Sequence, residues 1–265
     1  MRIPFAQIDA FADAPFGGNP AAVMPLSQWL ADDVLQAIAA ENNLSETAFL
    51  IPDASGEADF ELRWFTPGHE VRLCGHATLA SGHFVLSSDT DRTQVRFRTR
   101  RAGVLTVMRE GAGYTLALPA WKPEPRPLPE VVAALGVTDV VETLWREGGY
   151  GVIVLESEAA VRAVRPDLRA LAATGDHQAI VTARGETAAV VSRMFAPGAG
   201  VDEDPVTGSA HAVIVPYWAE KLGTDRFGAY QASARGGALS CRLEGDRVVL
   251  GGACVTVIEG TFLLP

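Results

Sequence analysis

The sequence has little cysteine and no long apolar run, and both shortages bear on where the protein works. Its 265 residues include 3 cysteines, which lie far apart at Cys74, Cys241 and Cys254. An odd number at such spacings is typical of a reducing compartment and predicts no disulfide framework. No run approaches the ~18 apolar residues of a membrane helix, and residues 1–5 do not resemble a secretory signal. We therefore expect a cytoplasmic protein without membrane contact.

Positive charge is also scarce, which argues against nucleic acid as a partner. The sequence has 22 Lys and Arg against 32 Asp and Glu, a net charge of −10, whereas a nucleic-acid surface needs a basic patch. Four arginines do cluster, namely Arg96, Arg98, Arg100 and Arg101. They alternate along a predicted strand, which is more typical of a solvated strand face than of a binding patch.

The usual motifs for metals and nucleotides are absent from the sequence. His69, His76 and His83 recur every seven residues, but on a helix this spacing spans ~10.5 Å. Ligand bonds of ~2 Å cannot join such distant side chains to one ion. There is no paired His motif with a Glu, no closely spaced Cys pair and no Gly-rich phosphate loop. We therefore expect neither a metal nor a cofactor.

Two segments 130 positions apart repeat each other. Arg193, Phe195, Pro197, Gly198 and Val201 follow the order of Arg63, Phe65, Pro67, Gly68 and Val71. This spacing is too long for a solenoid repeat and indicates duplication of a whole domain. We predict an N-terminal lobe over residues 1–120 and a C-terminal lobe over 121–265. The Pro-rich stretch 122–129 is the best linker candidate, and a terminal strand is free to cross between the lobes.

Each half combines many short strands with one helix that is apolar on nearly every side. These helices are predicted over residues 75–86 and 208–222, and such helices need burial all round. A curved antiparallel sheet wrapped around each helix provides it, which predicts an α+β fold. Three further helices are expected: one from Ser27 to Asn42-Asn43, one over Pro129–Leu135 and one over Asp167–Ala173.

The starts of the two apolar helices are the best candidates for a binding site. Each begins at a glycine, Gly75 or Gly208, so its free amides are open to an anionic ligand. We expect the two starts to face each other across an inter-domain cleft and to bind a small carboxylate. The same amides would stabilise an enolate-like oxyanion. The alternative is that the glycines merely begin well-packed helices.

Five ionisable residues are expected near these helix starts: Glu46, Cys74, His76, Asp204 and His211. His76 is the least ordinary of them, because a buried imidazole needs a partner; Asp204 and Glu46 have ordinary explanations beside the functional one. Asp204 precedes a helix start, where a capping carboxylate is common, and Glu46 could face outward from a half-exposed strand. A cysteine at a helix N-terminus is expected to have a lowered pKa, which makes Cys74 a candidate nucleophile or thiolate base, although no second thiol matches it.

Four motifs in register resemble the phenazine-biosynthesis PhzF-like isomerases. They are Phe16–Val23, Asn43–Phe49, Cys74–Ala80 and Asp204–Ala210, and the terminal Gly251–Gly260 also fits. The resemblance spans essentially the whole chain. It implies a diaminopimelate-epimerase-like fold of two pseudo-symmetric lobes, each a mostly antiparallel β-barrel wrapped around a central apolar helix. It also implies pairing as a homodimer.

The resemblance further implies a mechanism. In the family's best-understood member, cofactor-free proton transfer isomerises a dihydro-hydroxyanthranilate. The family's catalytic positions correspond to Glu46, His76, Asp204 and Ser209, and the substrate-binding positions to Asn19, Gly75, Thr207 and Gly208. Glu46 would remove a proton from carbon and return it, or a solvent-derived one, elsewhere on the substrate. The other catalytic residues would bind the carboxylate and hydroxyl groups or relay protons.

Related epimerases and proline racemases use two cysteines, one before each central helix. Here Cys74 occupies the first position, but Pro205 is expected at the second, which disfavours a two-thiol mechanism. Two alternatives remain open. One is an amino-acid or hydroxy-acid epimerase that uses Cys74 with Glu46 or Asp204, and the other is a small-molecule binding protein without catalysis. Because a fold does not fix a substrate, the sequence predicts no pathway.

Overall fold

The computed structural model describes residues 1–264 and divides the chain into two compact units. The first unit comprises residues 1–117 and the segment from Gly251 onward, and the second comprises residues 118–250. The chain thus leaves the first unit and returns to it near its end. Within the described residues, no helix combines the length and the hydropathy that crossing a membrane requires.

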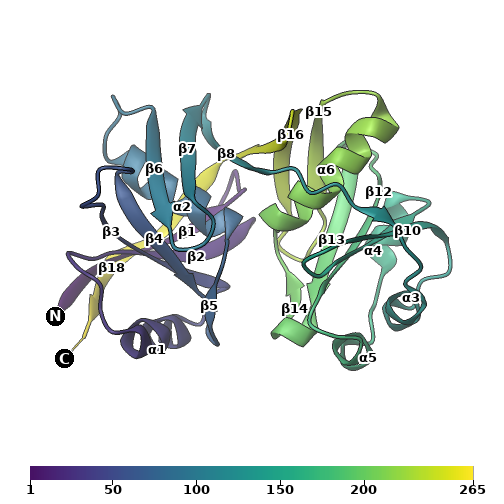
Figure 1. Ribbon diagram of the computed structural model, residues 1–265, viewed down its shortest axis with the longest axis horizontal. Helices are drawn as coiled ribbons and strands as arrows, with labels where there is room; N and C mark the ends of the chain where they lie inside the picture. Colours follow the sequence, from purple (N-terminus) through teal and green to yellow (C-terminus); the bar gives the residue numbers. More distant parts are fainter. Residues whose placement is uncertain (265) are drawn as a thin grey trace. The chain divides into compact units, whose positions relative to one another are not determined.

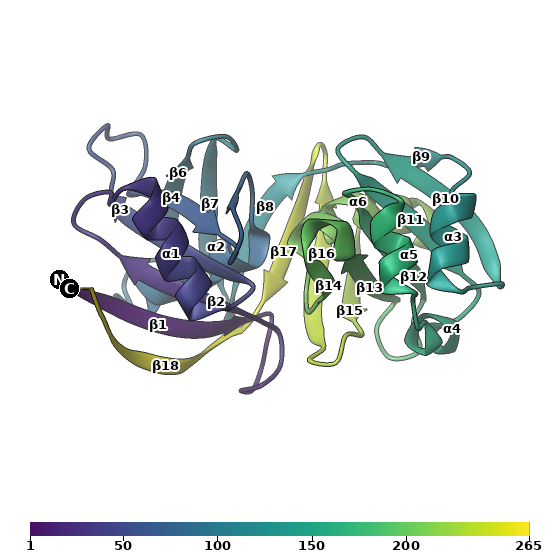
Figure 2. The same cartoon turned by 90° about the horizontal axis from the view of Figure 1, so that it is seen from below.

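The first unit is built on a mixed sheet. Its strands are β1 (Arg2–Ala10), β2 (Asn19–Pro25), β3 (Glu46–Pro52), β4 (Phe60–Phe65), β5 (Glu70–Val71), β6 (Gln94–Thr99), β7 (Val104–Glu110), β8 (Gly113–Pro119) and β18 (Cys254–Leu263). They pair in the order β18-β1-β2-β3-β4-β6-β7-β8, with β5 also on β4. The pairs β2–β3 and β4–β6 are parallel. Both views of the ribbon show β18 running beside β1 (Figures 1 and 2).

Helix α1 (Asp32–Asn42) packs against β3 and β4 and covers a small core. It ends as predicted, because Asn43 adopts a left-handed conformation (φ 49°) in which its amide reaches the carbonyl of Ala39. The predicted start at Ser27 is wrong by five residues. Leu26 still bonds to Leu50 as an extension of the sheet, and the backbone turns helical only after Ala31, which is extended.

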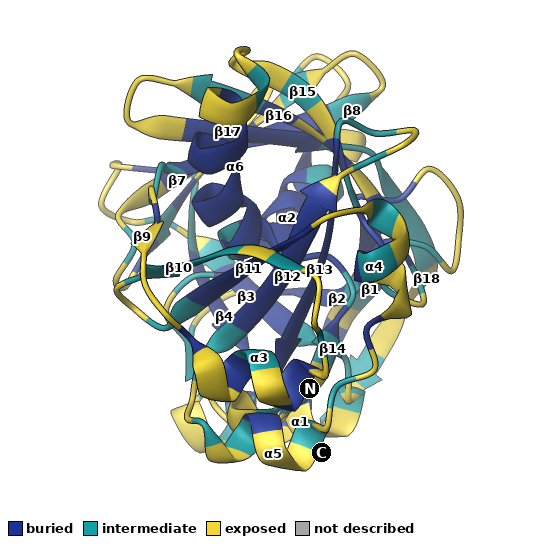
Figure 3. Cartoon of the chain, turned by 90° about the vertical axis from the view of Figure 1, so that its right-hand side faces the viewer, coloured by how far each residue is buried: buried dark blue, intermediate teal, exposed yellow. Residues whose placement is uncertain are grey.

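Helix α2 (Gly75–Ser87) is buried over 10 of its 13 residues, as its apolar composition predicts. It contacts β1, β2, β3, β6, β7 and β18, and Figure 3 shows it in dark blue, the colour of buried residues. Gly82 allows the closest approach, since a Cβ there would lie 2.3 Å from a methyl group of Val107. A helix that touches strands on so many sides has its first turn fixed by the sheet.

The second unit has its own mixed sheet. Its strands are β9 (Glu124–Pro125), β10 (Val140–Arg146), β11 (Tyr150–Leu155), β12 (Gln178–Arg184), β13 (Val190–Ala196), β14 (Val201–Asp204), β15 (Arg226–Gln231), β16 (Gly237–Glu244) and β17 (Arg247–Gly252). They pair in the order β9-β10-β11-β12-β13-β15-β16, with β14 also on β13. Strand β9 lies within the Pro-rich stretch 122–129, where it pairs with Leu144 and Trp145.

The helices of this unit are α3 (Pro129–Leu135), α4 (Glu158–Ala163), α5 (Leu168–Ala173), the 3₁₀ turn η1 (Pro197–Ala199) and α6 (Gly208–Leu222). Helices α3 to α5 cover a core that includes Phe195, Leu135 and Leu171. Helix α6 is buried over 11 of its 15 residues and contacts β11 and β16. Sequence periodicity missed α4 and β10, because each is short and half-exposed.

The two units repeat one pairing pattern. The parallel pairs β2–β3 and β4–β6 correspond to β11–β12 and β13–β15, and the antiparallel pairs between them match as well. In each unit the short strand on β4 or β13 leads directly to the buried helix. The fold is therefore a mixed α/β arrangement with few helices, built twice from the same plan.

Candidate active site

Glu46 and His76 form the central contact of the first unit. Glu46 is the first residue of β3, and His76 is the second residue of α2. Oε2 of the carboxylate lies 3.0 Å from Nε2 of the imidazole, and the two side chains are 16% and 5% exposed. At this distance the two groups form an ion pair when the imidazole is protonated. The buried imidazole of His76 therefore holds the half-buried carboxylate of Glu46 in one orientation.

Asn19 and Cys74 contact the other side of the His76 ring. Nδ2 of Asn19 lies 3.1 Å from Nδ1, and Sγ of Cys74 lies 3.5 Å from the same nitrogen. Asn19 is fully buried at the start of β2. The sequence resemblance predicts Asn19 as a substrate-binding residue, and in the structure its side chain contacts the imidazole of His76.

The buried groups around His76 have shifted pKa values. Burial lowers the pKa of His76, whereas the charge of Glu46 raises it, and the balance lies above its ordinary value. Burial, reinforced by the charge of Glu46, raises the pKa of the Cys74 thiol to about 11. The expectation of a lowered pKa at this helix N-terminus is therefore wrong, because desolvation outweighs the helix dipole. Cys74 is a thiol at neutral pH, a weak nucleophile and a weak base.

Glu46, Cys74 and His76 also form the one group of three potential metal ligands found among residues 1–264, with ligand atoms within 4.8 Å of one another. The geometry suits a hydrogen-bonded cluster better than an ion. An ion at Nε2 of His76 would displace the 3.0 Å contact with Glu46. An ion at Nδ1 would compete with Asn19 for that nitrogen.

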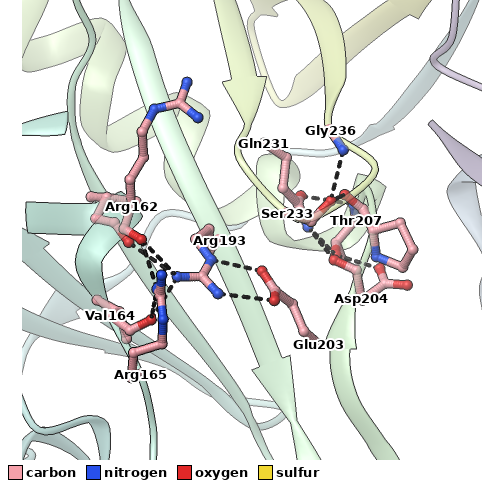
Figure 4. A network of polar contacts seen from close by, with 12 residues as sticks. Arg162, Val164, Arg165, Arg193, Glu203, Asp204, Thr207, Gln231, Ser233 and Gly236 are labelled. Atoms are coloured by element: carbon pink, nitrogen blue, oxygen red, sulfur yellow. Dashed lines mark hydrogen bonds and ion pairs between the residues drawn. The ribbon is translucent and has the colours of Figure 1, made fainter. Parts of the chain in front are cut away.

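Asp204 belongs to a polar cluster in the second unit. It ends β14, and its Oδ2 accepts a short hydrogen bond from the hydroxyl of Thr207 (Figure 4). Gln231 joins them, since its amide donates to the carbonyl of Asp204 at 2.7 Å and its oxygen accepts from the Thr207 amide at 2.9 Å. The N-cap of α6 is Thr207 itself, whose side chain makes no capping hydrogen bond.

The helix starts match each other closely. The N-caps Cys74 (φ −140°, ψ 111°) and Thr207 (φ −113°, ψ 105°) are both extended, and Gly75 and Gly208 follow them. Thr207 is thus the counterpart of Cys74. The expectation that Pro205 holds that position is wrong, because the whole segment between β13 and α6 is longer than the segment between β4 and α2. The conclusion is unchanged, since a hydroxyl, not a second thiol, stands there.

The side chain of His211 hydrogen-bonds to the backbone of its own helix α6. Its Nδ1 donates to the Thr207 carbonyl at 2.8 Å, as the hydroxyl of Thr78 donates to the Cys74 carbonyl in α2. Burial lowers the pKa of His211 to about 4, so the ring is neutral. Both side chains secure the first turn of their helix.

Ser209 lies beside two residues that sequence reasoning missed. Its hydroxyl donates to Oε1 of Gln178 at 3.4 Å. Burial raises the pKa of Tyr150, and both side chains lie near enough to its hydroxyl to lower that pKa. The signal was present in the sequence, because Gln178 follows Glu46 by 132 positions, close to the spacing of the repeat. Amides and phenols belong to no catalytic motif, so the motif search passed over them.

The structure therefore gathers the predicted residues into two groups. Glu46, His76, Asn19 and Gly75 lie together in the first unit. Asp204 and Thr207 contact each other in the second unit, where Gly208 and Ser209 begin α6.

Comparison with known proteins identifies the family. A model of the family described as phenazine biosynthesis-like protein (PhzC-PhzF) matches residues 8–260. The chain belongs to the PhzC-PhzF family. An uncharacterised isomerase of Pseudomonas aeruginosa is 49% identical over 266 residues, covering 100% of both chains. The crystal structure of a PhzF-family protein of Enterococcus faecalis matches with a TM-score of 0.92 and 42% identity, covering 100% of both chains.

PhzC-PhzF proteins share their fold with more distant enzymes. A hydroxyproline epimerase of Agrobacterium vitis matches with a TM-score of 0.62 over 98% of this chain and 92% of that one. At 11% identity this likeness shows the fold alone. The relatives named above place the chain among isomerases, and it is an enzyme of that class.

Proposed function

We propose that this PhzC-PhzF protein is a cofactor-independent isomerase that moves a proton on a small carboxylate-bearing substrate, with Glu46 as the acid/base. The observation that carries the proposal is the contact of Glu46 with His76. A half-buried carboxylate at the start of a strand, 3.0 Å from a buried imidazole, is suited to general acid–base catalysis. A glutamate that only faced solvent would need no such partner.

In this proposal Glu46 breaks a C–H bond of the substrate and takes its proton. The electron pair passes into the substrate's π system, the double bond moves, and a new C–H bond forms at another carbon. The proton for that bond comes back from Glu46 or from solvent. His76 stays paired with Glu46 and relays protons, and Asn19 holds the imidazole from its other side.

The residues of the second unit are proposed to bind the substrate. Asp204, Ser209 and Thr207 would contact its carboxylate and hydroxyl groups, with the amides of Gly75 and Gly208 as further donors. Binding of one substrate by both helix starts, across a cleft between two barrel-like lobes, belongs to the same proposal, as do pairing into a homodimer and a cytoplasmic location. The repeated N-cap geometry supports it, because open amides favour a carboxylate.

An epimerase using Cys74 is the alternative that one observation favours, since Sγ lies 3.5 Å from Nδ1 of His76. Against it stands the pKa of about 11, which leaves the thiol protonated at neutral pH. Thiol alkylation separates the two mechanisms, because it abolishes activity only where the thiol takes part.

The test is NMR-detected deuterium incorporation from D2O into cyclohex-1-enecarboxylate, crotonate, 2-aminobenzoate and L-glutamate. We expect wild-type protein to exchange or isomerise at least one of them and Glu46→Gln to lose the reaction by roughly 10³-fold. Glu41→Gln, a change at an exposed glutamate on α1, is the matched control and should react like wild type. Exchange that survives in Glu46→Gln would refute the assignment of the base. Saturable binding without exchange would instead indicate a binding protein.

A further inference from the structure

The second unit contains a counterpart of the Glu46–His76 pair. In the parallel pair β2–β3, Glu46 lies opposite Ala21, and in the equivalent pair β11–β12, Gln178 lies opposite Tyr150. Both Glu46 and Gln178 are the first residue of their strand. His76 and Ser209 are each the second residue of the buried helix. Position by position, an amide replaces the carboxylate, a hydroxyl replaces the imidazole and a phenol is added.

These three side chains form a connected polar group without negative charge. Ser209 donates to Gln178 at 3.4 Å, and Tyr150, opposite Gln178 in the strand pair, has both as polar neighbours of its hydroxyl. Burial raises the pKa of Tyr150, although its hydrogen bonds and Arg146 oppose the shift, so the phenol stays protonated. The Tyr150 ring also packs on Trp121, with ring centroids 5.6 Å apart. The group is thus fixed in place and is rich in donors.

We propose that Tyr150, Gln178 and Ser209 form a neutral subsite that binds the carboxylate of the substrate. Gln178 provides an amide where the first unit has a base, and Tyr150 is a positioning residue that orients the Ser209 hydroxyl. The inference rests on the proposed function, which it deepens by dividing the work between the units. A carboxylate at position 178 would repel an anionic substrate group, whereas an amide of the same shape donates to it.

The charge of position 178 provides the sharpest test. Binding of benzoate and of its uncharged analogue benzamide is followed through the amide shifts of Gly208 and Ser209 in ¹H–¹⁵N spectra of the full chain. We expect benzoate to move both amides. Gln178→Glu should weaken benzoate about 10-fold or more, as expected for a lost hydrogen bond to a charged group, and change benzamide less than about 2-fold. Crotonate, a smaller carboxylate, should behave like benzoate.

Tyr150→Phe tests the positioning role. We expect benzoate binding to weaken about 3- to 10-fold, because the Ser209 hydroxyl loses the polar neighbour that orients it. Benzamide should change less than benzoate, whereas damage to the fold would weaken both equally. Tyr230→Phe is the matched control, since this tyrosine of β15 contacts Arg162 instead. If Gln178→Glu does not fold, Tyr150→Phe and Ser209→Ala carry the same comparison.

The outcomes separate this inference from the proposed function. The binding readout needs no turnover, so it stands even if Glu46→Gln retains exchange and the assignment of the base fails. If exchange depends on Glu46 but neither benzoate nor crotonate moves the two amides, the subsite is refuted alone. Equal losses for benzoate and benzamide in Gln178→Glu would also refute it.

Discussion

In the first unit the strand pair β2–β3 and helix α2 bring a carboxylate, an imidazole and a thiol together. The equivalent elements of the second unit, β11–β12 and α6, bring together an amide, a hydroxyl and a phenol. The backbone register is the same in both. At these matched positions the first copy has a carboxylate and an imidazole, and the second has an amide and a hydroxyl.

What the units keep in common is what their packing requires. In each unit a buried arginine donates two hydrogen bonds to the carboxylate of a glutamate in the next short strand. The pairs are Arg63 of β4 with Glu70 and Arg193 of β13 with Glu203. The two units therefore share the arginine–glutamate pairs that hold the short strands before the buried helices. They differ at the first residue of the strand, Glu46 or Gln178, and at the second residue of the helix, His76 or Ser209.

The largest expected effect comes from giving the first unit the side chain of the second. His76→Ser should slow exchange by roughly 10²- to 10³-fold, because Glu46 loses the group that holds it and relays its proton. The rate of deuterium incorporation measures this. His83→Ser is the matched control on the same helix, since His83 contacts Tyr114 and Thr256. An unchanged rate in His76→Ser would mean that the two units do not differ in chemistry at this position.

The next effect concerns the buried arginines. Arg193→Met should lower the free energy of unfolding by about 3 kcal/mol, because it leaves the Glu203 carboxylate and the carbonyl groups at the end of α4 without their hydrogen-bond donor. Besides Glu203, Arg193 donates to the carbonyl of Val164 at 2.8 Å, at the end of α4 (Figure 4). Arg63→Met should cost about 2 kcal/mol, because Asp32, its second partner, is exposed and regains water.

Urea denaturation of both variants measures this difference. Lys122→Met is the control, because it breaks an ion pair that is about two-thirds exposed on both sides and should cost less than about 1 kcal/mol. A larger loss in Arg63→Met than in Arg193→Met would show that the helix-end contacts contribute little.

A smaller effect separates His211 from its counterpart Thr78. The folded pKa of about 4 lies below the ordinary value of 6.5, so the unfolded chain binds a proton that the folded chain does not. Stability therefore falls as the pH drops below 6.5, by about 2 kcal/mol at pH ~5. His211→Thr keeps a hydroxyl donor for the Thr207 carbonyl and should remove this part of the pH dependence. Unfolding curves at pH 6.5 and pH ~5 give the free energy of unfolding of both proteins. The prediction is contradicted if His211→Thr loses as much stability between these pH values as wild type does.

The sequence predicted most of the frame for a physical reason. Apolar helices that begin at glycine, and the repeated Arg, Phe, Pro and Gly before them, have strong local signals, so α2 and α6 begin where expected. The spacing of the repeat drifts from 130 at Arg63 and Arg193 to 133 at Gly75 and Gly208. The segment from the end of β13 to α6 is longer than the segment from the end of β4 to α2, and this drift led to Pro205 being taken as the match of Cys74.

The site was only partly predictable. Resemblance supplied Glu46 and His76, but their 3.0 Å contact and the two contacts on Nδ1 of the ring depend on tertiary packing. The raised pKa of Cys74 has the same origin, because only the folded chain buries the thiol. Tyr150 and Gln178 lie 28 residues apart in sequence, and only the pairing of β11 with β12 brings them together.

The smallest effect concerns the turns that lead into the two sites. Between β1 and β2, Phe16 has a φ of 75° with its side chain 83% exposed, and its amide donates to Asp9 at 3.0 Å. The corresponding turn between β10 and β11 uses Gly148 and Gly149 at positive φ. A left-handed conformation costs a non-glycine residue about 1–2 kcal/mol, and glycine costs about 0.5–1 kcal/mol in chain entropy.

Phe16→Gly should therefore stabilise the fold by about 0.5 kcal/mol, because relief of the backbone outweighs the entropy. Thermal unfolding measures it, with Phe16→Ala as the control that removes the ring but keeps the unfavourable φ. If both variants gain equally, the ring and not the backbone is the source of the strain. If Phe16→Gly loses stability, the exposed ring has a packing role in this turn. A gain in stability for Phe16→Gly but not for Phe16→Ala would mean that the first unit keeps a destabilising phenylalanine three residues before Asn19. The corresponding turn of the second unit has glycine, which adopts the left-handed conformation without this strain.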